Sequence, residues 1–115
     1  MPPESDVVRI RHMVGACREA MTFCQGRDRS DLDSDRMLAR AVVKAIEIVG
    51  EAASKVSAET RSGMPGVPWA EIVTMRHRLT HTYFDIDLDI VWNTTTLDLP
   101  PLVSDLDHWL AAHAR

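Results

Sequence analysis

Apolar residues recur at intervals of four and three positions through the middle of this 115-residue chain. Over residues 34–56 this spacing brings an apolar side chain to the same face of a helix at every turn. The members of the repeat are Leu38, Val42, Ala45, Val49, Ala52 and Val56. Such a repeat is typical of the seam between packed helices, so it predicts a helical bundle rather than a sheet.

Three other stretches also have helical spacing. A first helix is expected over residues 6–23, a third from residue 68 to about 83, and a fourth from about residue 87. The buried side of the third helix should carry Ile72, Met75, Leu79 and Tyr83. Pro100 and Pro101 should interrupt the fourth helix and begin a short fifth one. We therefore predict one domain, residues 1–115, with an all-α fold: an antiparallel four-helix bundle with a short fifth helix.

The charge is unevenly distributed along the chain, whose formal net charge is -4. Basic and acidic residues nearly balance through residue 83, whereas residues 84–115 carry six Asp and one Arg. This balance argues against non-specific coating of nucleic acid. Without a signal peptide or a long apolar run, we expect a cytoplasmic protein with no membrane contact. Cys17 and Cys24 are expected to be reduced and buried.

Two arginines, two histidines and a tyrosine are concentrated between residues 76 and 83, in the run RHRLTHTY. On a straight helix Arg76 and His81 would point about 140° apart. Both can reach one ligand only if the helix ends or kinks near Leu79, or if two chains face each other across a twofold axis.

The residue types of this cluster suit a phosphodiester. Arginine presents a planar fork of donors to phosphate oxygens, and histidine exchanges protons near neutral pH. Together they supply what RNA cleavage needs, since RNA carries its own nucleophile in the 2′-hydroxyl. No metal or other cofactor is required for that reaction.

Two other interpretations of the cluster remain open. Basic residues in the last turn of a helix also complement the helix dipole, and the spacing alone is more typical of that role. His77 and His81 lie four apart and could bind a metal, but the sequence has no HExxH pattern and no clear third ligand. We therefore expect no metal site.

The run from Arg76 through His81 to Tyr83 resembles the signature of HEPN domains of the HepT type, which are small all-helical ribonuclease toxins. His77 occupies the polar position of that signature, where asparagine is commoner. The resemblance extends over nearly the whole chain, in AVVKAIEIVGEAASKVSAETR, PGVPW, YFDID, VW and DLPPL.

The resemblance implies a homodimer and metal-independent endoribonuclease action by Arg76 and His81, with RNA as substrate. It also implies a toxin–antitoxin pair of type II or VII character, in which a minimal nucleotidyltransferase is the antitoxin. Tyr83 would be the residue to which that partner transfers AMP. An added phosphodiester there would compete with RNA for the donors of Arg76.

Four further residues are candidates for a supporting role. His77 and Thr80 would line the cleft, and Glu47 or Glu51, on the second helix, would brace Arg76 through an ion pair. Gly50 lies between these two glutamates, where close packing against the third helix would explain it. An alternative to the enzyme is a non-catalytic helical adaptor that binds a nucleotidyltransferase or a nucleotide. A bundle kept only for dimerisation is a third possibility.

Overall fold

The computed structural model describes residues 2–82 and 85–114, and at Thr80–Thr82 it describes the backbone alone. Most of this length is helical, which confirms the all-α prediction. The elements are α1 (Glu4–Cys24), α2 (Asp31–Ser34), α3 (Arg36–Ser54), α4 (Ala58–Ser62), α5 (Trp69–Val73), α6 (Met75–Leu79), β1 (Thr80–Thr82), β2 (Asp85–Ile86), α7 (Leu88–Asn93), the π-helix η1 (Thr94–Asp98) and α8 (Leu99–His113).

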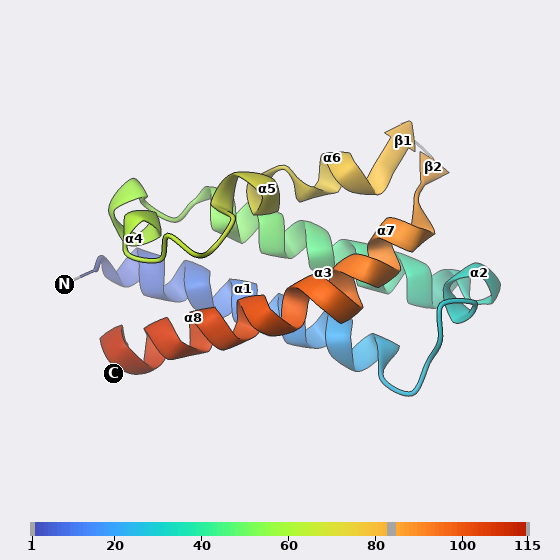
Figure 1. Cartoon of the computed structure of the whole chain (residues 1–115), viewed down its shortest axis with the longest axis horizontal. Coiled ribbons are helices and arrows are strands. Elements are labelled where there is room, and N and C mark those ends of the chain that lie inside the picture. Colours follow the sequence, from blue (N-terminus) through green and yellow to red (C-terminus); the bar gives the residue numbers. More distant parts are fainter. Residues whose placement is uncertain (1, 83–84, 115) are drawn as a thin grey trace.

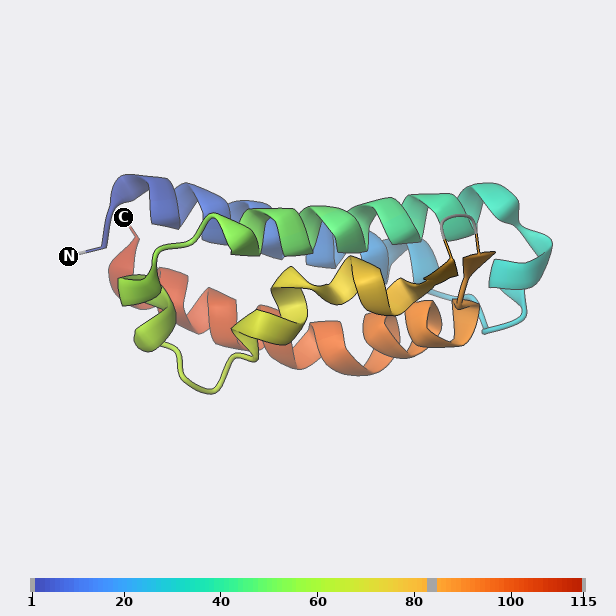
Figure 2. The same cartoon turned by 90° about the horizontal axis from the view of Figure 1, so that it is seen from above.

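The long helices run back and forth along an elongated molecule (Figure 1). α1 and α3 pack against each other in opposite directions, and α8 packs against α1. Between α4 and β1 the chain runs back along α3 as α5 and α6. Seen from above, this α5–α6 segment lies between α3 and the α7–η1–α8 run (Figure 2). Its side chains can therefore line two different sides of the molecule.

The predicted seam of α3 forms part of the core. All six of its apolar residues are buried, and they pack with residues of α1 and α8 such as Ile10, Met13 and Leu106. Cys17 and Cys24 are both free thiols in buried positions, as expected. Burial raises the pKa of the Cys17 thiol to about 12, so this side chain behaves as a small apolar group.

The third helix differs from its prediction. It is broken at Thr74, where the backbone leaves helical geometry (φ -97°, ψ 9°) and the hydroxyl donates a hydrogen bond to the carbonyl of Ala70 at 2.9 Å. After α6 the chain does not continue as a helix to residue 83. It extends as β1, which pairs antiparallel with β2, and the Asp87 N–H donates to the Leu79 carbonyl at 2.7 Å. β-branched Thr80 and Thr82 favour this extended backbone. The predicted burial of Tyr83 lies outside the described residues.

The prolines of the C-terminal run also act differently from the prediction. α7 begins where expected, because the Asp87 side chain accepts hydrogen bonds from the backbone N–H groups of Asp89 and Ile90. Pro100 and Pro101 fall in the first turn of α8, as predicted, but they do not interrupt the chain or leave only a short fifth helix. The π-helix η1 joins α7 directly to α8, and the first turn of α8 tolerates residues without an N–H donor.

Candidate functional site

Arg76 and His77, both exposed on α6, line a hollow that faces α3. The α3 side of this hollow carries the carboxylates of Glu47 and Glu51. We call it the α3–α6 hollow, and its volume is about 450 Å³. It therefore offers donors for a phosphate on one wall and two carboxylates on the other.

Gly50 is the residue of α3 that lets α5, and with it the α5–α6 segment, approach so closely. A Cβ atom at this position would lie 2.9 Å from the carbonyl oxygen of Ile72, a backbone atom of α5. Because the obstacle is backbone, a larger residue would have to push the whole segment away from α3. The close packing expected at this glycine is confirmed, and it sets the width of the α3–α6 hollow.

The structure brings together four of the seven predicted site residues: Arg76, His77, Glu47 and Glu51. The Glu51 Oε1 atom lies 3.9 Å from the Nζ atom of Lys55, which caps the C-terminal end of α3. Whether either glutamate braces Arg76 remains a prediction.

Thr80 and His81 follow directly on α6, in β1, and their side chains lie outside the described part of the structure. The whole of Tyr83 lies outside it. The end of α6 at Leu79 is the kind of helix end that convergence of Arg76 and His81 on one ligand would need.

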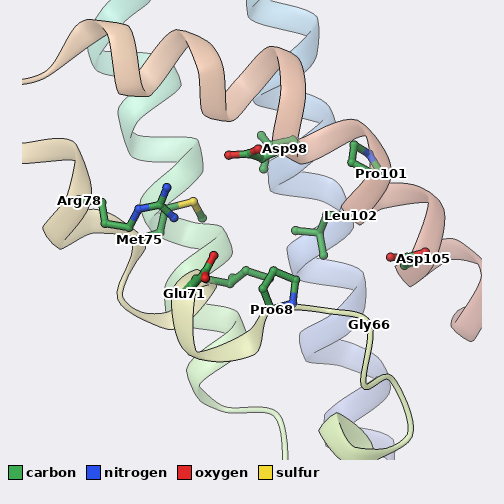
Figure 3. Close-up of a pocket in the computed structure, with 11 residues that line it drawn as sticks. Gly66, Pro68, Glu71, Met75, Arg78, Asp98, Pro101, Leu102 and Asp105 are labelled. Carbon is green, nitrogen blue, oxygen red and sulfur yellow. The ribbon is translucent and has the colours of Figure 1, made fainter.

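A second hollow lies on the opposite side of the α5–α6 segment, between it and α8 (Figure 3). Its volume is about 340 Å³, and its lining combines apolar side chains with the carboxylates of Glu71, Asp98 and Asp105. Arg78 is its one Lys or Arg, so its formal charge is negative. We call it the acidic pocket. The sequence pattern does not predict this pocket, although the excess of Asp in residues 84–115 is a signal that points to it.

The described residues include neither a helix that could span a membrane nor a cluster of metal ligands. No described helix is both long enough and apolar enough to cross a bilayer. Within residues 2–82 and 85–114, no three His, Cys, Asp or Glu side chains are placed to hold a metal ion together.

The comparisons with known proteins identify the family. The sequence profile described as "Ribonuclease HepT-like" matches residues 13–108, which include α6 and both strands. The chain belongs to the HepT-like ribonuclease family. The resemblance noted from the sequence is thereby confirmed, and it extends over nearly all of this HepT-like chain.

Individual relatives agree with the family assignment. A protein of Caldanaerobacter subterraneus, provisionally named as an RNase, is 34% identical over 93 residues, which cover 81% of this chain and 83% of the relative. A Methanocaldococcus jannaschii protein with the same kind of provisional name is 30% identical, with coverage of 80% and 84%. A Thermococcus cleftensis protein named a probable ribonuclease HepT is 36% identical, with coverage of 63% and 66%. No solved structure matches this HepT-like chain.

Proposed function

We propose that this HepT-like protein is a metal-independent endoribonuclease toxin whose Arg76 binds the scissile phosphate and whose His81 transfers protons. The observation that carries the proposal is the α3–α6 hollow, which Arg76 and His77 line within one turn of the end of α6. Because α6 ends at Leu79, the side chains of Arg76 and His81 need not point about 140° apart, as they would on a straight helix.

The proposed reaction needs no group from outside the protein and the RNA. A base removes the proton of the 2′-hydroxyl, and the 2′-oxygen forms a bond to phosphorus. The bond from phosphorus to the 5′-oxygen breaks, and an acid returns a proton to that leaving oxygen. The products are a 2′,3′-cyclic phosphate and a free 5′-hydroxyl. The Arg76 guanidinium stabilises the negative charge that builds on the phosphoryl oxygens, an effect worth roughly 3–4 kcal/mol in comparable sites.

A homodimer would supply the second proton-transfer group. Two copies of His81, one from each chain, would serve as base and acid across a twofold axis. His77 and Thr80 would line the same cleft. Mixing an inactive His81→Ala chain with the wild type should then reduce activity by more than the fraction of wild-type chains lost. A strictly proportional loss would argue that each chain works alone.

The same proposal includes regulation by a minimal nucleotidyltransferase that acts as antitoxin. The Tyr83 hydroxyl would attack the α-phosphorus of ATP, forming an AMP phosphodiester and releasing pyrophosphate. A negative charge at this position would compete with RNA for Arg76. Mass spectrometry of the co-expressed pair should detect addition of AMP, and Tyr83→Phe should abolish it.

Cleavage of RNA by the purified protein is the decisive test. Wild type should release products with 2′,3′-cyclic phosphate ends, whereas His81→Ala and Arg76→Ala should each be at least 100-fold slower. Addition of EDTA should leave the wild-type rate unchanged. Equal rates for all three proteins would remove the catalytic proposal.

A non-catalytic adaptor is the second candidate, and the acidic pocket favours it. A pocket with an apolar lining and a surplus of carboxylates suits a basic segment of a protein partner better than RNA. A tyrosine that gains AMP on a protein with no ribonuclease activity would support the adaptor.

A further inference from the structure

Three hollows adjoin one another along the exposed face of α3, two on the side of α6 and α7 and one on the side of α1. The α3–α6 hollow shares Glu47 with a neighbouring hollow of about 270 Å³, which Arg40 and Lys44 line. In the other direction it shares Glu51 with a smaller hollow of about 130 Å³ between α1 and α3. The basic side chains of the smaller hollow are Arg9, His12 and Lys55. Because neighbouring hollows share a lining residue, the three together form one depressed region of the surface with the α3–α6 hollow at its middle.

The spacing of the charged residues on α3 keeps this depression on one face. Arg40, Lys44, Glu47, Glu51 and Lys55 follow one another at steps of four, three, four and four. Steps of this size place side chains in one stripe along a helix. From Arg40 to Lys55 the stripe extends over about 22 Å, at 1.5 Å per residue. At about 3.4 Å per stacked nucleotide this is room for roughly six phosphates.

The depression is positively charged although the chain is not. Its lining holds five Lys or Arg residues against two Glu, a formal charge of +3, on a chain whose total is -4. The remainder of the chain therefore carries -7. Such segregation creates a local field that attracts a polyanion despite the acidic total.

Most basic residues of this face are not held by an ion pair with a described carboxylate. Arg18, Arg27 and Arg29 form ion pairs with aspartates elsewhere in the molecule. Within the described part of the chain, Arg9, Arg40 and Lys44 have no such pair. The Lys55 ammonium nitrogen lies 3.9 Å from a Glu51 carboxylate oxygen, and an exposed pair of this kind is weak.

We propose that this depression, which we call the basic track, binds the phosphates of single-stranded RNA on both sides of the cleaved bond. Arg40 and Lys44 hold the strand on one side of the α3–α6 hollow, and Arg9 and Lys55 hold it on the other. The track recognises charge and not bases, so it increases affinity without selecting a sequence. This inference rests on the ribonuclease proposal and extends it to the length of substrate that is bound.

Salt dependence of RNA binding tests the track directly. The probe is a fluorescein-labelled 12-nucleotide single-stranded RNA, bound to protein carrying His81→Ala so that it is not cut. Adding Arg40→Gln and Lys44→Gln should weaken binding about tenfold at low salt. It should also reduce the slope of log K against log salt by about 1.4, because two phosphate contacts are lost.

The matched control removes two positive charges outside the track. Arg11 lies exposed on α1 and lines none of the three hollows, and Arg78 lines the acidic pocket. Arg11→Gln with Arg78→Gln should leave the slope unchanged. Equal slopes for the track variant and this control would overturn the proposal. Binding of a 12-residue polyglutamate as tight as that of RNA would also overturn it, in favour of an acidic protein partner.

Cleavage of a dinucleotide separates failure of the track from failure of the ribonuclease proposal. With His81 present, Arg40→Gln and Lys44→Gln should slow cleavage of the 12-nucleotide RNA and leave dinucleotide cleavage unchanged. If both substrates are cut at wild-type rates, the track is wrong and the ribonuclease stands. If wild type cuts neither substrate, the ribonuclease proposal is wrong, and the salt slopes alone decide whether the track binds RNA.

Discussion

The two sides of the α5–α6 segment face surroundings of opposite charge, the basic track on one side and the acidic pocket on the other. Arg76 and His77 line the side toward α3, whereas Arg78, the next residue, lines the side toward α8 together with three carboxylates (Figure 3). Helical geometry divides the neighbours, since consecutive residues point about 100° apart. A short, interrupted helix thus supplies basic side chains to two hollows whose surroundings differ in charge.

The largest expected effect contrasts the two arginines of α6. Arg76→Ala should lower the rate of RNA cleavage by 100- to 1000-fold, because the charge that stabilises the phosphoryl oxygens is lost. Arg78→Ala removes the same charge two residues away and should change the rate by less than about threefold. Cleavage assays at a fixed salt concentration compare them. Similar losses would mean that net charge, and not position in the α3–α6 hollow, determines activity.

The next effect concerns the contact between α1 and the start of α4. Asp6 is buried, with 2% of its surface exposed, and accepts hydrogen bonds from the hydroxyls of Ser57 and Thr60 and from the backbone N–H of Ser57. Asp6→Ala leaves these donors unsatisfied and should lower the free energy of unfolding by about 3 kcal/mol. Chemical denaturation measures this loss. An unchanged midpoint would show that the α1–α4 contact does not stabilise the fold.

The same carboxylate makes a prediction for pH. Burial raises the pKa of Asp6, but the hydrogen bonds from Ser57 and Thr60 lower it more, so the net pKa is below its usual value. The stabilisation is therefore fully present above the unfolded pKa of about 3.9 and is lost as pH falls through the lower folded pKa. Asp6→Asn should remove this part of the acid sensitivity in denaturation curves measured between pH 2 and about pH 5. Parallel curves for the two proteins would contradict the prediction.

A pair of glycines tests how closely the segment is packed. Gly50→Ala should lower the free energy of unfolding by about 1–3 kcal/mol, because its Cβ would meet the Ile72 carbonyl at 2.9 Å. A Cβ atom at Gly15, on α1, would meet no atom within 4 Å. Gly15→Ala should therefore raise the free energy of unfolding by about 0.5–1 kcal/mol through helix propensity. Thermal unfolding measures both. Stabilisation by both substitutions would show that α5 moves freely on α3.

The smallest effect comes from the acidic pocket. Asp98→Asn with Asp105→Asn removes two negative charges from the side that faces away from α3. RNA binding should rise by about twofold at low salt and not at all at high salt, because only screened, long-range repulsion is relieved. Titration of the labelled RNA at two salt concentrations measures this. A large gain at both would place RNA on the acidic side.

The sequence by itself determined the helical class, the buried seam of α3, the start of a helix near Asp87 and the cluster at Arg76 and His77. Each of these follows from periodicity or from residue chemistry that acts over one or two helical turns. The break at Thr74, the end of α6 at Leu79 and the continuous path through Pro100 were decided only by tertiary structure. There the packing of a carbonyl against Gly50, the pairing of β1 with β2 and the π-turn of η1 outweigh local preference. The contrast between the basic track and the acidic pocket has the same origin, because it depends on which helix lies opposite each side chain.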